Sequence, residues 1–395
     1  MYSRAPHIPP CGGDGQRRPK LAHLEVFRSS NYYEVTMSPT KASSEKKTLM
    51  PCGFATAPQR PGAHLKPRPM HSTNANPLTF DDVEAAHARI QHFVHRTPVL
   101  TSQSLDSMLA AHLFFKCENF QRTGAFKVRG AFNAVLSLAE EQIARGVTTS
   151  SSGNQAAALS LAAKVRGVRA YVAMPRIAVS SKVEAVRRYG GEIIWVESSA
   201  GVPTSDDYEA ATDKIVRDTG ATLVHPYNNL RTIAGQATCA LEFLNVAPEL
   251  NILLAPVGGG GLLAGTALTA KAMNASVQII GCEPEMADDA QRSFREGHIV
   301  PQSRPQTVAD GLRTSLGSLT YPLIKSHVDD IVTVSEEGIV RAMRLIWETL
   351  KIVIEPSSAV PVAALLEHRI DVAKKSVGII LTGGNANLDQ LPWLT

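Results

Sequence analysis

The chain has 395 residues, of which 44% are hydrophobic and 19% charged, so it is long enough to bury a large core in one or two domains. No apolar run approaches the roughly 18 residues that span a bilayer, and we expect no membrane segment. The formal net charge of +4 comes from residues 1–70, which hold 11 Lys and Arg against 4 Asp and Glu, so the remainder is slightly acidic and a nucleic-acid partner is not expected.

Residues 1–72 are predicted to be a disordered extension. Ten of the 24 prolines fall within the first 70 residues, and these residues show no apolar periodicity. Their basic, acid-poor composition would also suit an organelle transit peptide, although the prolines argue against the amphipathic helix that such a peptide forms. Met70 could alternatively be the true first residue.

The cysteines are odd in number and widely scattered, with no CxxC spacing. This pattern predicts free thiols in a reducing compartment for Cys11, Cys52, Cys117, Cys239 and Cys282. We therefore predict a cytoplasmic protein. The mitochondrion or the plastid is the alternative if the N-terminal residues are a transit peptide.

Short strands rich in Val, Ile and Leu alternate with helical segments from about residue 80 onward. Strands are expected at 170–174, 192–196, 222–224, 252–257, 278–281 and 377–381. This alternation predicts an α/β fold with a largely parallel sheet covered by helices on both faces. In such sheets ligands bind outside the carboxyl ends of the strands.

Lys127 is expected to lie in the first turn of a helix, because apolar residues follow at Val128, Ala131, Phe132 and Val135. Both the positive end of the helix dipole and partial burial disfavour an ammonium ion there. These effects lower the pKa of the amine and make it a better nucleophile toward an aldehyde. The alternative interpretation is an ordinary exposed lysine at a helix start.

A polar turn is expected at 150–155, between a short strand and an Ala-rich helix that reaches about Ala163. Its hydroxyl, amide and free N–H groups would meet a carboxylate at the start of that helix. The alternative is a Ser or Asn N-cap that needs no ligand.

Four consecutive glycines, Gly258, Gly259, Gly260 and Gly261, lie between a buried strand and a helix. Such a loop can close its N–H groups around a phosphate. The same segment also satisfies the G-x-G-x-x-[G/A] pattern of nicotinamide-dependent dehydrogenases, with Glu283 about 20 residues further on as the acid that would bind the ribose. A dehydrogenase is therefore the rival interpretation.

Together these segments resemble the fold type II pyridoxal-phosphate enzymes, in particular the serine/threonine dehydratase and serine racemase family. The resemblance covers about Leu78 to Trp393. It also includes, in the order of the family, Arg96-Thr97-Pro98-Val99-Leu100, His225-Pro226-Tyr227, Ile233-Ala234-Gly235-Gln236, Ala309-Asp310-Gly311, Ile354-Glu355-Pro356-Ser357-Ser358-Ala359 and Leu381-Thr382-Gly383-Gly384-Asn385. It implies a fold like that of the tryptophan synthase β subunit. A small domain at 146–228 would be inserted into a large domain made of 73–145 and 229–395, with the cofactor in the cleft between two parallel-sheet domains.

The resemblance assigns the cofactor contacts residue by residue. Lys127 would bind pyridoxal phosphate covalently, next to Phe126, and Asn154 would bind the ring hydroxyl. The glycine loop and Leu262 would hold the phosphate through their N–H groups. Thr382, where family members usually carry serine, would donate its hydroxyl to a neutral pyridine nitrogen, which favours β-elimination. The alternative for Thr382 is a turn residue before two glycines.

The same resemblance implies that L-serine or L-threonine is converted to a 2-keto acid and ammonia. Ser151, Ser152, Asn154 and Gln155 would bind the substrate. Ser152 would face Lys127 across the cofactor, and a proton donor on that second face would add serine racemase activity. The alternative for Ser152 is a capping hydroxyl, and a non-catalytic relative that only binds the cofactor is a further alternative.

Three positions depart from the pattern of the family. Gln155 and Ser150 stand where histidines are frequent, and Tyr208 falls near the place of an arginine that faces the substrate. Loss of that cation should weaken binding of acidic substrates such as 3-hydroxyaspartate. We therefore expect a neutral hydroxy amino acid as substrate.

By resemblance to the racemase branch, Mg²⁺ or Ca²⁺ would be bound by Glu283, the carbonyl of Ala287 and Asp289, which suits the oxygen ligands that these ions prefer. From spacing alone, the segment is an acidic helix N-terminus. ATP as an effector would contact Ser102, Arg122, Thr123, Lys351 and Asn385. A homodimer is expected from the family.

Overall fold

The computed structural model describes residues 78–151, 153–178, 180–197, 204–303 and 305–394. The predicted N-terminal extension, Met70 and Ser152 lie outside the described residues. Among the described residues, none of the helices combines the length and the apolar character that crossing a membrane requires.

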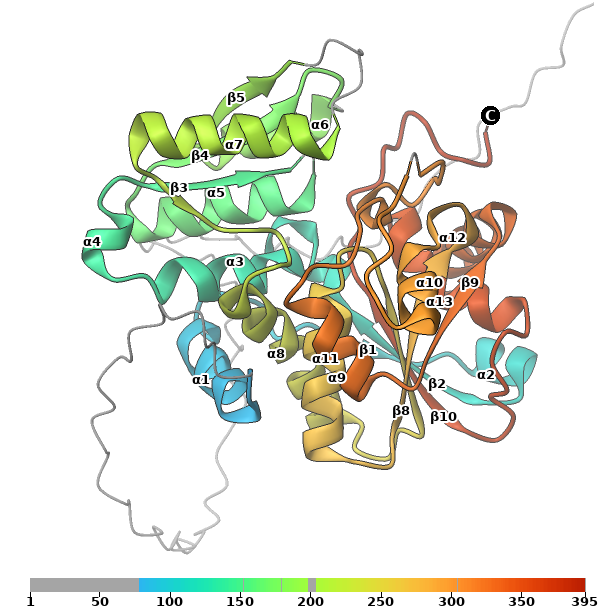
Figure 1. The fold of residues 1–395 in the computed structure, drawn as a ribbon. Helices are drawn as coiled ribbons and strands as arrows, with labels where there is room; N and C mark the ends of the chain where they lie inside the picture. The colour runs from blue at the N-terminus through green and yellow to red at the C-terminus, as the bar shows by residue number, and fades with distance from the viewer. Residues whose placement is uncertain (1–77, 152, 179, 198–203, 304, 395) are drawn as a thin grey trace, which may run out of the picture. The chain divides into compact units, whose positions relative to one another are not determined.

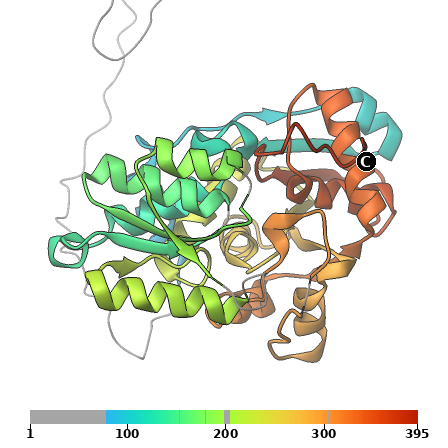
Figure 2. The same cartoon turned by 90° about the horizontal axis from the view of Figure 1, so that it is seen from above.

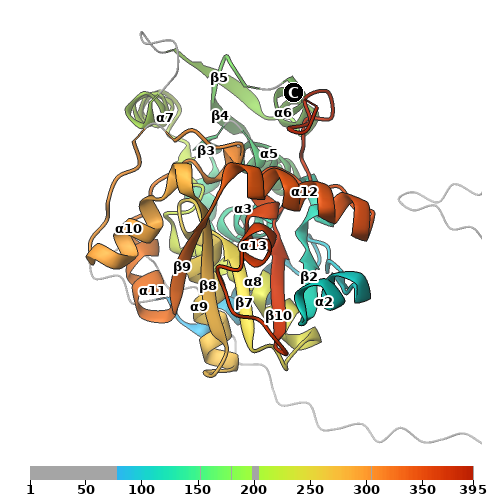
Figure 3. The same cartoon turned by 90° about the vertical axis from the view of Figure 1, so that its right-hand side faces the viewer.

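Two sheets organise the described part of the chain (Figure 1). The larger has the order β1-β2-β10-β7-β8-β9, and all its neighbouring strands are parallel except β1 and β2. Its strands are β1 (Val99–Leu100), β2 (His112–Cys117), β7 (Ile252–Pro256), β8 (Gln278–Pro284), β9 (Asp330–Val334) and β10 (Ser376–Leu381). Figure 3 views this sheet with β10, β7, β8 and β9 side by side.

The smaller sheet is entirely parallel and has the order β5-β4-β3-β6. Its strands are β3 (Val147–Ser150), β4 (Ala170–Pro175), β5 (Glu192–Val196) and β6 (Thr222–Leu223). Figure 2, seen from above, shows the green elements of this sheet on one side and the orange and red elements of the larger sheet on the other. The predicted α/β class with two parallel sheets is confirmed, whereas the domain boundaries at 146 and 228 stay a prediction.

Helices cover both faces of both sheets. They are α1 (Phe80–Ile90), α2 (Gln103–Leu109), α3 (Lys127–Leu136), α4 (Glu140–Ile143), α5 (Asn154–Arg166), α6 (Ser180–Arg188), α7 (Ser205–Thr219), α8 (Leu230–Val246), α9 (Gly261–Met273), α10 (Asp289–Glu296), α11 (Thr320–His327), α12 (Glu336–Leu350) and α13 (Pro356–Leu366). Short 3-10 turns lie at η1 (Glu118–Phe120), η2 (Arg122–Gly124), η3 (Glu285–Ala287) and η4 (Asp310–Leu312).

The alternation of side chains along β7 explains why its sequence is apolar throughout. Leu253 and Ala255 pack into a core that contains α8 and α9, whereas Ile252 and Leu254 pack into a second core with α12 and α13. A strand buried on both faces needs apolar residues at every position. The smaller sheet follows the same rule, because Val172 of β4 packs with α5 and α6 on the opposite side from α7.

The cysteines of the described segments are free and buried, at Cys117, Cys239 and Cys282. Burial raises the pKa of the Cys117 thiol to about 12, so this thiol is protonated and unreactive at neutral pH. The prediction of free thiols is therefore confirmed for these three positions. Cys11 and Cys52 lie outside the described residues.

Candidate active site

Lys127 begins α3, as its sequence pattern predicts. The preceding residues pair with the end of β10: the N–H of Phe126 donates to the carbonyl of Thr382 at 2.9 Å, and Ala125 forms a bridge with Gly383. This pairing holds the start of α3 at the carboxyl end of the larger sheet, beside the residue predicted to face the pyridine nitrogen.

The amine of Lys127 donates a hydrogen bond to the carbonyl of Pro226 at 3.0 Å. Part of the side chain is still exposed, but protein atoms surround the amine closely. Burial lowers the pKa of Lys127 to about 8, and the nearby carboxyl of Glu355 opposes that shift. The structure therefore supports the predicted lowering of the Lys127 pKa, and burial is its main cause.

The glycine loop connects β7 to α9. Gly260 has φ +86°, and a Cβ there would lie within 2.9 Å of side-chain atoms of Ile324, Leu316 and Thr320. A Cβ on Gly259 would lie 2.3 Å from the ring of Tyr227. The space beside these glycines is therefore occupied by protein side chains, and glycine is needed for packing as well as for exposing N–H groups.

The N–H groups of Gly261 and Leu262 are the first of α9 and have no acceptor within the helix. They point along the axis of a helix whose positive end attracts anions. Because glycine has no side chain to cover them, these N–H groups can serve as the donors that a phosphate group requires.

The turn before α5 joins the two sheets through its side chains. The amide nitrogen of Asn154 donates to the carboxylate of Glu355 at 2.8 Å, and the amide oxygen of Asn154 accepts from Asn385 at 2.8 Å. One N–H of the Asn154 amide stays available for a ligand. Within the turn itself, the N–H of Gly153 donates to the hydroxyl of Ser151 at 3.1 Å.

Gln155 follows this turn in the first turn of α5 and is 1% exposed. Neither atom of its side-chain amide has a hydrogen-bond partner among the described residues. A buried amide without partners costs free energy, so an orphaned amide beside a polar turn is a feature of a ligand site. Ser150, at the end of β3, lies just before the turn.

Thr382 is buried at the end of β10, and its hydroxyl lies 3.0 Å from the hydroxyl of Ser358. The Ser358 hydroxyl also lies within 2.7 Å of the carbonyl and of the N–H of Gly383. Ser358 therefore orients both Thr382 and the glycine turn that follows it, a role that the sequence did not indicate.

Glu355 is a second site residue to which sequence reasoning gave no role. It caps α13, is 4% exposed, and its N–H donates to the carbonyl of Gly383 at 2.9 Å. Burial raises the pKa of this carboxyl to about 7, and the neighbouring acid Asp310 acts in the same direction. Its position in the Ile354-Glu355-Pro356 motif was noted, but only the fold shows that it contacts Asn154.

Tyr208 lies in α7 and packs against the core formed by β4, β5 and α7. Burial raises the pKa of its hydroxyl, so the side chain is neutral at physiological pH. The structure therefore shows Tyr208 as an uncharged, partly buried ring packed into this core.

The two carboxylates predicted to bind a metal lie close together. Both oxygens of Glu283 accept N–H groups, from Ala290 at 3.0 Å and from Gln291 at 2.9 Å. Burial raises the pKa of Glu283, and the nearby charge of Asp289 adds to that shift. One oxygen of Asp289 accepts from Gln302 at 3.1 Å, while its other oxygen is buried without a partner.

Two buried acids whose charges repel each other are the arrangement that a divalent ion would relieve. Ala287, predicted to supply a carbonyl, is buried in η3 between them in sequence. Over the described ranges there is no group of three or more Asp, Glu, His or Cys side chains that could hold a metal. The predicted set has only two carboxylates, and the metal stays a prediction.

The structure does not favour Glu283 as the ribose-binding acid of a dehydrogenase. The side chain is fully buried, and its two oxygens accept the N–H groups of Ala290 and Gln291 in the first turn of α10. A carboxylate this enclosed does not reach a ribose, whereas a small ion can still bind to its remaining lone pairs. The dehydrogenase interpretation therefore loses Glu283, the acid that completed its sequence pattern.

The residues predicted for a nucleotide are only partly brought together. Asn385 donates to the carbonyl of Thr123 at 2.8 Å. Arg122 donates to the carbonyl of Phe93 at 2.7 Å, and Ser102 caps α2. Lys351 ends α12 with φ +58°. Thr123 and Asn385 thus share one location, while Arg122 and Ser102 are already engaged by the protein.

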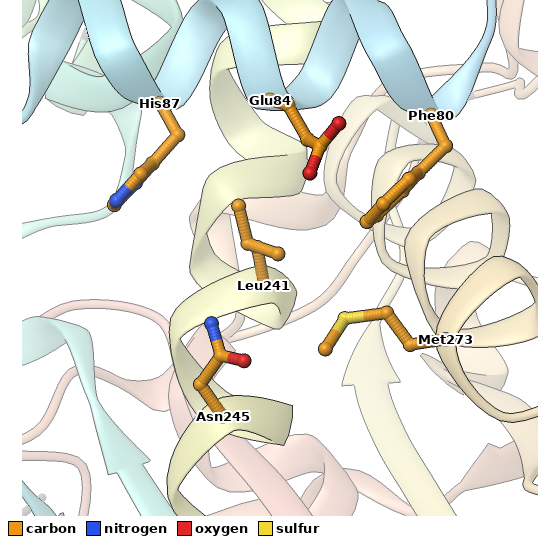
Figure 4. A pocket seen from close by; sticks show the side chains of 6 residues that line it. All are labelled: Phe80, Glu84, His87, Leu241, Asn245 and Met273. Atoms are coloured by element: carbon orange, nitrogen blue, oxygen red, sulfur yellow. The ribbon is translucent and has the colours of Figure 1, made fainter. Parts of the chain in front are cut away.

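A separate cavity of about 550 Å³ lies between α1, α8 and α9 (Figure 4). It is lined by Phe80, Glu84, His87, Leu241, Asn245 and Met273. None of the residues predicted for cofactor or substrate lines it.

Comparisons with known proteins agree with this geometry. A family described as "pyridoxal-phosphate dependent enzyme" matches residues 90–383. A β-hydroxyaspartate dehydratase from Paracoccus denitrificans (strain Pd 1222) is 50% identical over 80% of this chain and 98% of its own, and a serine racemase from Arabidopsis thaliana is 48% identical over 78% and 93%. The structure of maize serine racemase superposes with a TM-score of 0.77 at 45% identity, covering 81% of this chain and 97% of that one. The chain therefore belongs to the pyridoxal-phosphate-dependent enzymes, and the fold type II membership that its motifs predicted is confirmed.

Proposed function

We propose that this chain catalyses β-elimination of L-serine or L-threonine to a 2-keto acid and ammonia, with serine racemase activity in addition. The observation that carries the proposal is the Lys127 amine, whose pKa is lowered to about 8 by burial and which donates to the Pro226 carbonyl, at a helix start that Phe126 ties to the carbonyl of Thr382. The names of the relatives, a β-hydroxyaspartate dehydratase and serine racemases, support the same reaction class.

The residues fit pyridoxal phosphate. The Lys127 amine is suited to bind an aldehyde, and Phe126 precedes it on the same turn. The N–H groups of residues 258–262 are suited to the phosphate, the free N–H of Asn154 to the ring hydroxyl, and the Thr382 hydroxyl to the ring nitrogen. When bound, the cofactor supplies the electron-withdrawing ring that acidifies the hydrogen on the substrate Cα.

The remaining steps belong to this chain's own side chains. The start of α5, with Ser151, Asn154 and Gln155, binds the substrate carboxylate, and the orphaned Gln155 amide is available to do so. The unprotonated Lys127 amine then removes the Cα proton, which a lysine with a pKa near 8 can do at physiological pH. The β-hydroxyl leaves as water with the proton that Lys127 took from Cα, and addition of a water to the product releases the 2-keto acid and ammonia.

Racemisation needs a second proton donor on the face of Cα opposite Lys127. We assign this role to Ser152, which lies outside the described residues, on the basis of its place in the turn. The two reactions differ by barrier differences of a few kcal/mol at most, so both can proceed at one site.

A neutral β-substituent is the proposed substrate feature, because the resemblance puts Tyr208, a neutral side chain, near the position of a substrate-facing arginine. One relative is named for an acidic substrate, β-hydroxyaspartate, and this makes 3-hydroxyaspartate the second candidate. The two candidates are separated by comparing kcat/KM for L-serine, L-threonine and 3-hydroxyaspartate.

Three finer features complete the proposal. Mg²⁺ or Ca²⁺ binds at Glu283, the Ala287 carbonyl and Asp289, as the unpaired oxygen of Asp289 supports. ATP acts as an effector near Thr123 and Asn385. The enzyme is a cytoplasmic homodimer, or a mitochondrial or plastid one if residues 1–72 are a transit peptide.

The test is a chromatographic assay of the full chain with L-serine, pyridoxal phosphate and Mg²⁺ that quantifies D-serine and pyruvate together. Both products are expected, both should be lost in Lys127→Ala, and D-serine alone should be lost in Ser152→Ala. Pyruvate without D-serine would restrict the function to dehydration. Absence of turnover with any hydroxy amino acid, despite bound cofactor, would identify a non-catalytic relative.

A further inference from the structure

An ion pair joins elements of the two sheets next to the turn at 150–155, which we assign to the substrate and call the substrate turn. Lys182 lies in the first turn of α6, beside the smaller sheet, and its amine pairs with the carboxylate of Asp310, which begins η4 beside the larger sheet. The side chain of Lys182 is 16% exposed and that of Asp310 is 39% exposed. The ammonium is therefore the more enclosed partner, and the carboxylate is open to solvent on one side.

The pair lies next to residues that we assign to the substrate. The amine of Lys182 is 3.6 Å from the position that a Cβ on Gly153 would occupy. Asp310 and Lys182 both act on the charge of Glu355, and Glu355 accepts a hydrogen bond from Asn154. The pair, the turn and Glu355 thus form one cluster at the carboxyl ends of the strands.

Asp310 is itself held on the side of the glycine loop. The N–H of Gly311 donates to the hydroxyl of Ser357 at 3.1 Å, and a Cβ on Gly258 would lie 3.2 Å from the carbonyl of Gly311. The carboxylate of Asp310 therefore stands at a fixed place between the loop predicted to bind the phosphate and the turn predicted to bind the substrate.

An enclosed ammonium next to a carboxylate-binding turn would normally favour a dicarboxylate. A second substrate carboxylate could replace a neighbouring anion as the partner of Lys182. Here Asp310 already fills that place as the partner of Lys182. An incoming second carboxylate would meet like charges at close range, which is unfavourable.

Resting on the proposed function, we propose that Asp310 and Lys182 form a specificity-determining pair. Asp310 is an internal carboxylate that occupies Lys182 and so reserves the space beside the substrate turn for an uncharged β-substituent. Loss of the Asp310 charge leaves Lys182 enclosed without an anion, and this lysine then binds the second carboxylate of 3-hydroxyaspartate.

The test compares Asp310→Asn, Lys182→Met and the double variant, each as full-length holoenzyme, by the ratio of kcat/KM for 3-hydroxyaspartate to that for L-serine. Asp310→Asn should raise this ratio about tenfold, the size of one newly formed charged contact. The double variant should lose the gain. An unchanged ratio in Asp310→Asn, or a gain that persists without Lys182, would overturn the proposal.

A matched control is available in the pair Lys271 and Asp329, whose side chains are 22% and 37% exposed. Lys271 lies near the end of α9 opposite the glycine loop, so Asp329→Asn removes a similar ion pair far from the substrate turn. Its ratio should equal that of the wild type. A change in this control would show that the ratio responds to general loosening of the structure.

A binding measurement that needs no turnover tests this inference independently of the proposed function. Isothermal titration calorimetry of the holoenzyme compares succinate, which has two carboxylates, with butyrate, which has one. Asp310→Asn should tighten succinate binding about tenfold and leave butyrate unchanged. Equal effects on both ligands, or none, would overturn the inference even if the wild type turns over no substrate.

Discussion

The guanidinium of Arg129 forms two hydrogen bonds with the carboxylate of Glu118, at 2.7 and 2.8 Å, and both side chains are fully buried. Glu118 lies before the loop that carries Lys127, and Arg129 lies two residues after it. The pair therefore closes that loop at both ends. Arg129 also binds Glu242, which pairs with Lys116 at 2.7 Å, so two cations and two anions balance in the core.

Arg129→Met should destabilise the protein by about 3–5 kcal/mol, because it leaves two buried carboxylates with one buried cation. Urea unfolding measures this change. In the double variant Glu118→Gln/Arg129→Met, the charges of Lys116 and Glu242 balance again, and the loss should be clearly smaller than the sum of the single variants. Additive losses would show that the four charges do not act as one network. Arg344→Met, which removes an exposed ion pair on α12, is the control and should change stability little.

Local patterns predicted most of the elements, while contacts between distant residues could not be predicted. The apolar runs at 192–196 and 377–381 correspond to β5 and β10, and the spacing after Lys127 correctly placed the start of α3. These features depend only on periodicity within a short segment.

The partners of the site residues depend instead on how the sheets assemble. Glu355 contacts Asn154 across about 200 positions of sequence, and Lys182 contacts Asp310 across more than 100. Neither residue has an unusual local pattern, since Glu355 precedes a helix and Lys182 lies among other charged residues of α6. Only the order of the strands in the two sheets brings these partners together.

The lowered pKa of Lys127 predicts how cofactor uptake depends on pH. The amine reacts with an aldehyde only when it is unprotonated, and burial lowers its pKa from 10.5 to about 8. The rate of uptake should therefore rise with pH up to about 8 and then level off. Mixing apoenzyme with pyridoxal phosphate between about pH 6.5 and 9.5, and following the visible absorption band, measures this rate.

A rate that still rises steeply above about pH 9 would contradict the lowered pKa, because an ordinary lysine titrates near 10.4. Lys127→Ala should give no band at any pH, which shows that the signal belongs to this residue. Lys164→Ala, in the last turn of α5, should behave like the wild type.

Gly260→Ala should weaken both the fold and cofactor binding. The new Cβ would occupy a positive φ and would lie 2.8–2.9 Å from three side-chain atoms. We expect about 1–2 kcal/mol from backbone strain and about 1–3 kcal/mol from overpacking. Urea unfolding measures the loss, and titration with pyridoxal phosphate measures the change in affinity.

Gly167→Ala separates these two causes. Gly167 caps α5 with φ +77°, but a Cβ there would meet nothing within 4 Å. It should lose only the backbone contribution of about 1–2 kcal/mol and bind the cofactor normally. Equal losses in both variants would mean that the side chains around Gly260 relax without cost.

Divalent cations should stabilise the protein through Glu283 and Asp289. Both acids are buried, and one oxygen of Asp289 has no partner, so a bound ion would compensate charges that otherwise repel. At a concentration about 100 times the dissociation constant, Mg²⁺ or Ca²⁺ should add about 2.7 kcal/mol. Thermal unfolding with Mg²⁺, with Ca²⁺ and with a chelator measures the difference in Tm.

Asp289→Asn should abolish the shift in Tm, because it removes the charge and one of the two carboxylate ligands. The variant should also be more stable than the wild type in chelator, since one of two buried acids that repel each other is gone. Asp288→Asn is the matched control: its carboxylate is half exposed and pairs with Arg292 at 2.8 Å. It should keep the response to the metal. A shift that survives Asp289→Asn but is lost in Asp288→Asn would place the ion outside the buried pair, on the exposed start of α10.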